Sequence, residues 1–208
     1  MKLPKRIFVT GAPGSRWSGI IQKIEEHHSQ MDISVYRDNQ RFDPVFRGGI
    51  VRGFHRGIYF EHGTEYEPIL DAEYLDKPWG DSDKCRFVRS HHWAYHLEEI
   101  REKFPDDWIL MVYRPDEMCL AWWMEVGGFH ITHPDYSFYK DVPTMSGHIK
   151  QMNLAMLKFG HDVNASWNYY TLPWITENFY EDISNAKGFD RINGPGKERN
   201  DILVSLVK

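Results

Sequence analysis

The chain has 208 residues, of which 41% are hydrophobic and 26% are charged, and its formal net charge is −5. This length is enough for one substantial domain spanning residues 1–208, and the negative charge argues against broad nucleic-acid binding. Two cysteines are too few for a disulfide framework. No apolar stretch approaches the ~20 residues of a membrane span, and the run behind the basic N-terminus is too short for a secretory leader, so we expect a cytoplasmic protein with no membrane partner.

The first expected elements are a buried strand, a glycine-bearing turn and a helix. Arg6–Thr10 is an apolar run typical of the strand, and Gly11–Ser15 follows it as the turn. Behind the turn, apolar residues recur at the spacing of one helical face: Trp17, Ile20, Ile21 and Ile24. A strand, a tight turn and a helix are the start of a βαβ unit.

Residues 29–84 have a weaker pattern. Val35–Arg37 is a candidate short strand, and Ile50–Gly53 with Gly57–Phe60 is a candidate hairpin. Glu61–Ser82 is rich in Gly, Pro, Asp and Glu, which predicts a loop. Long loops on compact domains often contact substrate, so we expect this region to do so.

Two further strands are expected at Arg86–Arg89 and at Trp108–Tyr113, which is an uninterrupted apolar run bounded by turn residues. Between them, one helical face is formed by Trp93, Leu97, Ile100 and Phe104. After the second strand, Pro115 is expected as the first helical residue, because proline and acidic side chains favour the first turn of a helix.

The last third of the chain is predicted to hold a helix, a strand and an apolar tail. The helix is marked by Ile149, Met152, Met156 and Phe159. Thr171–Ile175 is a candidate strand, and Ile202–Val207 fits either a strand or a short helix. Strands that alternate with helices predict an α/β fold with three layers, α/β/α, around a central parallel sheet.

The turn after the first strand is a candidate phosphate-binding loop, Gly11–Ser18. A glycine-rich turn at a helix N-terminus exposes successive backbone N–H groups, and the helix dipole favours an anion there. Arg16 and Ser18 add a cation and a hydroxyl. The loop is not a Walker A motif, because the Gly-Lys pair of that motif falls on Arg16 and Trp17. An ordinary βα turn is the alternative.

The segment Arg89-Ser90-His91 brings a cation and a candidate general base to the carboxyl edge of the sheet, where α/β sites lie. One alternative is the start of a surface helix. Another is a zinc site through His91, His92 and His96, for which no carboxylate or Cys completes an obvious ligand set.

Arg114 ends the second of these strands, just before a helix, and so presents a fork of donors suited to phosphate at the same edge. The alternative for this residue is a local ion pair with Asp116 or Glu117.

In order and spacing, these motifs resemble the PAPS-dependent sulfotransferase family, whose fold is P-loop NTPase-like. Ile7–Thr10 followed by Pro13–Ser18 resembles the family's 5′-phosphosulfate loop, and Arg86–His91 is similar to its strand ending in Lys-Thr-His. Trp108–Pro115 is similar to the strand whose Arg binds the 3′-phosphate, and Phe179–Ile183 to a Tyr-Glu-Asp-Leu segment. Residues 29–84 and 124–170 are not covered by the resemblance.

The resemblance implies that the chain takes PAPS (3′-phosphoadenosine 5′-phosphosulfate) as co-substrate, without a metal, and transfers its sulfuryl group to an unknown hydroxyl or amine acceptor. His91 would be the general base, and Arg89 or Arg16 would offset the charge on the departing phosphate. Arg114 would bind the 3′-phosphate and Tyr180 would lie by the adenine. The phosphosulfate would be bound by Pro13, Gly14, Ser15, Arg16, Trp17 and Ser18.

The chain departs from the family's pattern at three positions. Gly14 stands where the family has the loop cation, Arg16 stands where Gly is usual, and Ala121 and Trp122 replace the 3′-phosphate Ser. These departures favour one alternative, a non-catalytic nucleotide-binding protein on a decayed sulfotransferase scaffold, whereas the Arg-Ser-His segment favours the enzyme. A P-loop kinase or NTPase is the other alternative, and it would need a loop Lys and a carboxylate for Mg²⁺.

Overall fold

The computed structural model describes residues 2–35, 40–42, 45–46, 49–50, 53–55, 57–62, 64–125, 128, 140–180 and 201–208. In chain order its elements are β1 (Arg6–Gly11), α1 (Trp17–His27), β2 (Gln40–Phe42), β3 (Val45–Phe46), β4 (Gly49–Ile50), β5 (Gly53–His55), α2 (Ala72–Asp76), the 3₁₀ helix η1 (Lys77–Trp79), β6 (Arg86–Arg89), the 3₁₀ helix η2 (His92–Tyr95), α3 (Leu97–Lys103), β7 (Trp108–Tyr113), α4 (Asp116–Glu125), α5 (Val142–Asp162), β8 (Asn168–Tyr169), α6 (Leu172–Asn178) and β9 (Leu203–Val207).

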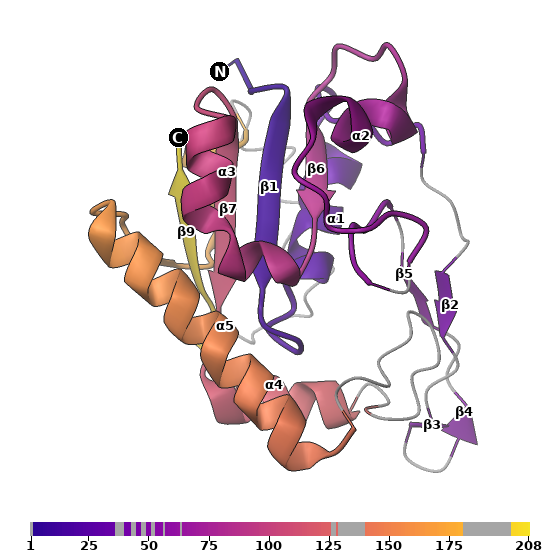
Figure 1. Ribbon diagram of the computed structural model, residues 1–208, viewed down its shortest axis with the longest axis vertical. Coiled ribbons are helices and arrows are strands. Elements are labelled where there is room, and N and C mark those ends of the chain that lie inside the picture. The colour runs from indigo at the N-terminus through magenta and orange to yellow at the C-terminus, as the bar shows by residue number, and fades with distance from the viewer. Residues whose placement is uncertain are drawn as a thin grey trace.

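Five strands form an open sheet in the order β6-β1-β7-β9-β8 (Figure 1). β1 runs parallel to both neighbours, with Val9 opposite Arg89 of β6 and Leu110 of β7. β9 is antiparallel to β7 and to β8. The predicted α/β class is confirmed in this form: the three neighbouring strands β6, β1 and β7 are parallel, and the apolar tail is the strand β9, which runs against them.

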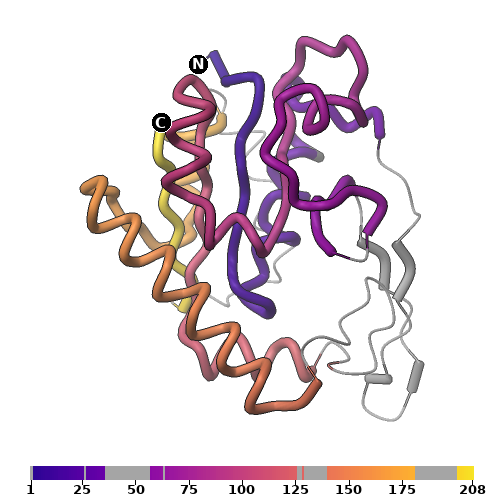
Figure 2. The backbone as a smooth tube through the Cα atoms, in the orientation of Figure 1, coloured from indigo at the N-terminus to yellow at the C-terminus, as the bar shows by residue number. Residues whose placement is uncertain are grey.

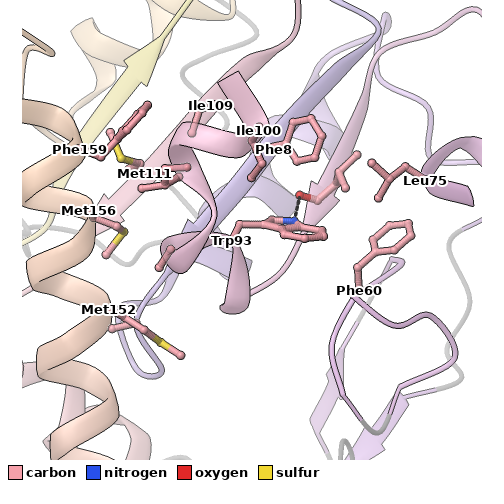
Figure 3. Close-up of a cluster of buried hydrophobic side chains, with 14 of the residues drawn as sticks. Phe8, Phe60, Leu75, Trp93, Ile100, Ile109, Met111, Met152, Met156 and Phe159 are labelled. Carbon is pink, nitrogen blue, oxygen red and sulfur yellow. Dashed lines mark hydrogen bonds between the residues drawn. The ribbon is translucent and has the colours of Figure 1, made fainter. Parts of the chain in front are cut away.

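Side chains of β1 alternate between two buried cores because successive residues of a strand point to opposite faces. Ile7 and Val9 pack with α1 and α6, whereas Phe8 packs with α3 and α5. The tube in Figure 2 shows α3 and α5 on the near face of the sheet. Figure 3 shows the core on that face, where Trp93 Nε1 donates to the Val88 carbonyl at 3.1 Å.

The helices predicted from apolar spacing are present. α1 buries its four predicted residues, and α5 buries its own predicted set, which is Ile149, Met152, Met156 and Phe159. The face predicted from Trp93 to Phe104 is divided between η2 and α3. Pro115 precedes α4 rather than opening it, since that helix begins at Asp116. Among the helices described, none combines the length and apolar character needed to cross a bilayer.

Two predictions from local pattern are wrong. Thr171–Ile175 is not a strand: Thr171 caps α6 by accepting a hydrogen bond from the Trp174 N–H, and a proline stands in the first turn. Glu61–Ser82 is not all loop, because Asp71 caps the short helix α2 by accepting from the Tyr74 N–H at 2.8 Å. In both segments a capping side chain outweighed the local composition.

The predicted hairpin between Ile50–Gly53 and Gly57–Phe60 is also wrong. β4 pairs with β3 and β5 pairs with β2, while Tyr59 forms a parallel bridge to Arg89. Strands this short carry too few alternating residues to specify a partner. Of the candidate strand Val35–Arg37, Val35 lies in a turn, and residues 36 and 37 are outside the described residues.

Candidate functional site

The carboxyl ends of β6, β1 and β7 meet at one edge of the sheet, because the three strands are parallel. From β1 the chain crosses to β6 through α1 on one face, and from β6 it passes back over β1 to β7 through α3 on the other face (Figure 1). β7 leads on to β8 and β9, which lie on its side away from β1. β1 and β7 therefore send their connections in opposite directions, and the edge between their carboxyl ends is a topological switch point, where ligands bind in open α/β sheets.

The loop Gly11–Ser18 leaves β1 at this switch point. The helix behind it begins at Trp17, as the sequence predicts. Two loop residues have left-handed backbone, Gly14 with φ 85° and Arg16 with φ 71°. Left-handed residues alternating with others turn successive N–H groups to one side, an arrangement that can bind anions. Between these two residues, the Ser15 N–H is already used, because it donates to the Ala12 carbonyl at 2.9 Å. The first N–H groups of α1 face the same edge, and helix geometry gives them no partner within the helix.

The inner side of the loop is tightly packed. A Cβ atom on Gly11 would lie 2.5 Å from Ser15 Oγ, and one on Gly14 would lie 1.9 Å from the Cys119 carbonyl oxygen, so both positions require glycine. Ser15 is fully buried, and among the residues described its Oγ has no hydrogen-bond partner. Pro13 is also buried. α4 thus covers one side of the loop, and the partly exposed loop residues are Gly14, Arg16 and Ser18.

His91 follows β6 and lies against the loop. Its Nδ1 is 2.6 Å from the Gly11 carbonyl oxygen and 3.1 Å from Trp17 Nε1. The imidazole and indole rings meet edge to face with 5.0 Å between centroids. A carbonyl requires a proton on Nδ1, whereas an indole N–H requires a lone pair there, so only one contact is satisfied at a time. The shorter contact to the carbonyl assigns the proton to Nδ1 and leaves the lone pair on Nε2.

Glu61 is a member of the site that the sequence analysis missed. It is buried, its Oε1 accepts the His91 backbone N–H at 2.7 Å, and the same oxygen lies 3.8 Å from His91 Nε2. The Phe60 N–H donates to the Arg89 carbonyl at 2.8 Å, and this backbone contact brings Glu61 to the end of β6. No motif marks Glu61 in the sequence, since it lies in a segment without a clear pattern.

Arg114 approaches the loop from the end of β7. Its Nη1 donates to the Gly14 carbonyl at 3.3 Å, and its Nε donates to Asp201 Oδ2 at 2.6 Å. Asp201, which precedes β9, is thus the carboxylate partner, in place of the Asp116 or Glu117 that a local ion pair would use. The structure therefore brings His91 and Arg114 to the predicted loop from either side.

Arg89 and Tyr180 lie apart from this cluster. The Arg89 guanidinium is buried on the α1 face of the sheet, where it pairs with Glu25 and lies 5.5 Å from the Tyr59 ring centroid. The Tyr180 hydroxyl donates to the Ile24 carbonyl at 3.1 Å, seven residues and so about 10 Å along α1 from its first residue. The rest of the predicted Tyr-Glu-Asp segment, residues 181–183, is outside the described residues.

His92 is turned away from the loop and packs against His62, with 4.6 Å between ring centroids. Burial, followed by the neighbouring charges of other histidines, lowers the pKa of His92 to about 4. Across the part of the chain that the structure describes, no three His, Cys, Asp or Glu side chains are placed to hold a metal ion.

The site therefore combines a loop with left-handed residues, a histidine and an arginine, contributed by the ends of three neighbouring strands. No protein-family model, curated protein or solved structure matches this chain.

Proposed function

We propose that the chain binds PAPS at the loop Gly11–Ser18 and is a sulfotransferase with His91 as its general base. The observation that carries the proposal is the convergence of three segments at one sheet edge. His91 contacts Gly11 across 80 residues of chain, and Arg114 contacts Gly14 across 100 residues. An ordinary βα turn needs neither contact, whereas a nucleotide site at a switch point needs groups from several strand ends.

We extend the proposal to the finer fold, a three-layer α/β/α arrangement with P-loop NTPase-like topology. The candidate loop follows β1, which has a parallel strand on each side. Helices pack on both faces of the sheet, α1 and α6 on one and α3 with α5 on the other. These features support that topology, although β9 is antiparallel to its neighbours.

In this proposal the 5′-phosphosulfate of PAPS lies on the loop amides at the start of α1, where the helix dipole favours negative charge. Arg114 takes the 3′-phosphate, because its guanidinium reaches the loop and offers the paired donors that phosphate oxygens accept. The adenine then extends along α1 toward Tyr180.

The transfer step forms a bond between the acceptor oxygen or nitrogen and sulfur, while the bond from sulfur to the bridging phosphate oxygen breaks. The electron pair of the broken bond stays on the phosphate, and the acceptor proton passes to His91 Nε2. The Nδ1–H bond to the Gly11 carbonyl fixes the imidazole ring. Glu61, 3.8 Å from Nε2, stabilises the imidazolium that forms. Loop amides and Arg16 offset the charge on the departing phosphate.

Calorimetric titration of the purified chain with adenosine 3′,5′-bisphosphate and with Mg²⁺-ATP tests the binding half of the proposal. Binding of the bisphosphate without binding of ATP is the expected result. Binding of ATP alone would instead identify a kinase or NTPase, and binding of neither would exclude a nucleotide site.

Screening acceptors with labelled PAPS tests the catalytic half. His91→Ala should reduce turnover by about 10²–10⁴-fold, the usual effect of removing a general base, and leave bisphosphate affinity unchanged. His92→Ala is the matched control and should retain most of the turnover. Bisphosphate binding with no sulfated acceptor would favour the decayed scaffold, which the burial of Arg89 against Glu25 also favours, since that cation cannot reach the departing phosphate.

A further inference from the structure

Arg16 occupies a backbone conformation that disfavours its side chain. Its φ is 71° and its ψ is 15°, a left-handed geometry, at the position immediately before α1. The Cβ atom of any L residue crowds the backbone in this region, whereas glycine adopts it without that cost. Lys140 and Asn164 share the left-handed geometry, so a role for Arg16 has to follow from what its side chain contacts.

Among the described residues, no carboxylate neutralises the charge of the Arg16 guanidinium. The group lies over the Trp122 ring of α4, 4.2 Å from the centroid. Within the described ranges no carboxylate forms an ion pair with Arg16, whereas Arg89 is paired with Glu25 and Arg114 with Asp201. An aromatic face attracts a guanidinium without using its N–H groups, because these donors lie in the guanidinium plane and stay open at its edge.

A second observation in the same loop indicates a missing ligand atom. Ser15, the residue before Arg16, is fully buried, and its Oγ has no hydrogen-bond partner among the described residues. Buried hydroxyl groups without a partner are uncommon in native proteins. The hydroxyl lies beside Gly11 in the loop, so an oxygen of a phosphate bound at the loop would give it a partner.

We propose that Trp122 is the positioning residue that holds the guanidinium of Arg16, the loop cation of the proposed function, at the 5′-phosphate group of the nucleotide. The inference rests on the proposed function and deepens it by naming the residue that orients this cation. α4 then fixes the loop at two points, since the Cys119 carbonyl lies against Gly14 and the Trp122 ring lies under Arg16.

Calorimetry with two nucleotides that differ only in the 5′-phosphate tests this assignment. The probes are adenosine 3′,5′-bisphosphate and adenosine 3′-monophosphate. Arg16→Gly should weaken binding of the bisphosphate by about 10–100-fold, the range of a charged hydrogen bond, and change binding of the monophosphate less than about twofold. Trp122→Leu should weaken bisphosphate binding by about 2–5-fold, and Trp122→Phe should restore most of that loss because it keeps an aromatic face.

The double variant Arg16→Gly with Trp122→Leu separates a positioning role from a general effect on the fold. If Trp122 acts through Arg16, the double variant binds the bisphosphate as weakly as Arg16→Gly alone, with no further loss. Arg16→Gly should also melt at a higher temperature than Arg16→Ala, because only glycine relieves the left-handed backbone.

The outcomes distinguish this inference from the proposed function. If the unaltered chain binds neither nucleotide, the proposed function fails. If it binds the bisphosphate, and Arg16→Gly binds it equally well, the proposed function stands and Arg16 is not the loop cation. If Trp122→Leu weakens both nucleotides to the same extent, the positioning role of Trp122 is overturned.

Discussion

Charged residues have different partners at the amino ends and at the carboxyl ends of the parallel strands. At the amino edge, Arg6 at the start of β1 pairs with Asp107 at 2.6 Å and with Asp76 at 2.9 Å. Arg86 at the start of β6 is fully buried and pairs with the same Asp76 at 3.3 Å. Lys5 adds a third cation to Asp76 at 2.7 Å. Each of these three cations thus has a carboxylate partner.

At the carboxyl edge, three polar groups lack a fully matching partner among the described residues. Arg16 has an aromatic face in place of a carboxylate, the buried Ser15 Oγ has no partner among the described residues, and His91 Nδ1 meets two groups with opposite requirements. Buried polar atoms are normally satisfied, and the amino edge has an exception of its own, because Arg86 Nε has no hydrogen-bond partner among the described residues. The two edges therefore differ in how their cations are paired. The amino edge pairs each cation with a carboxylate, which serves stability, whereas at the carboxyl edge no described carboxylate pairs with Arg16, which suits an anionic ligand.

The largest effect is expected from breaking the amino edge. Asp76→Ala leaves Arg86 buried without its carboxylate, which should lower the free energy of unfolding by about 3–5 kcal/mol. Denaturant titration measures this loss. Lys5→Ala is the matched control: the Lys5 side chain is 52% exposed, so its loss should cost less than about 1 kcal/mol. Equal losses in the two variants would show that Asp76 does not support Arg86.

At the carboxyl edge, Arg114→Ala should affect the ligand more than the fold. Affinity for adenosine 3′,5′-bisphosphate should fall by about 1.5–3 kcal/mol, the scale of a charged hydrogen bond, and affinity for adenosine 5′-monophosphate should hardly change. Calorimetry with both ligands measures the difference. Asp201→Asn is the control, because it removes the partner carboxylate and leaves the guanidinium in place. Equal losses of affinity for both nucleotides would show that Arg114 acts through the fold and not through the 3′-phosphate.

His92 predicts how stability responds to acid. The pKa of His92 is lowered from 6.5 to about 4. Burial is the largest cause, and the charges of four other histidines add to it: His91, His62, His96 and His148. Between pH 6.5 and about 4, His92 therefore binds a proton in the unfolded chain but stays neutral in the folded chain. The free energy of unfolding is consequently full above pH 6.5 and decreases as the pH falls toward 4.

After allowance for the partial exposure of His92, this loss should be about 1–2 kcal/mol. Denaturant titration at neutral pH and near the lower pKa measures it. His92→Gln should remove most of the difference, whereas His161→Gln, whose side chain is 89% exposed in the native protein, should keep it. A His92→Gln profile that still falls as steeply would assign the acid sensitivity to other groups.

The sequence was sufficient for the parts of the site that depend on strong local patterns. β1 and β7 follow from apolar runs, and Arg86–Arg89 was predicted as the strand now seen as β6. Parallel strands bring their carboxyl ends together, which placed the loop, His91 and Arg114 at one edge. The side of the sheet on which the Arg89 side chain lies could not be predicted from the sequence. All four residues of β6 are buried, and a strand buried on both faces has no alternation of polar and apolar residues that would distinguish them.

Glu61 and Asp201 were beyond prediction for a different reason. Each reaches the site through one long-range contact, Glu61 to His91 across 30 residues and Asp201 to Arg114 across 87 residues. Both lie outside any strongly patterned helix or strand, so neither periodicity nor a motif relates them to their partners. Such contacts are fixed by tertiary packing alone.

The smallest effect on stability is expected at Tyr180, whose variants also test the boundary of the ligand site. The last carbonyl groups of a helix have no partner within it, and the Tyr180 hydroxyl donates to one of these, the Ile24 carbonyl of α1. Burial raises the pKa of the phenol, so the hydroxyl remains a donor at neutral pH. Tyr180→Phe should therefore lower the free energy of unfolding by about 1 kcal/mol, the usual contribution of one hydrogen bond.

The same variant tests the proposed place of the adenine. Tyr180→Phe keeps the aromatic ring, so an adenine that stacks on it should still bind, and bisphosphate affinity should stay within about twofold of the unaltered chain. Tyr180→Leu removes the ring, and a stacked base should then lose about 1–3 kcal/mol. If Tyr180→Leu binds the bisphosphate as the unaltered chain does, Tyr180 is only a cap of α1 and belongs with the residues that build the fold. The ligand site would then end at the loop, His91 and Arg114.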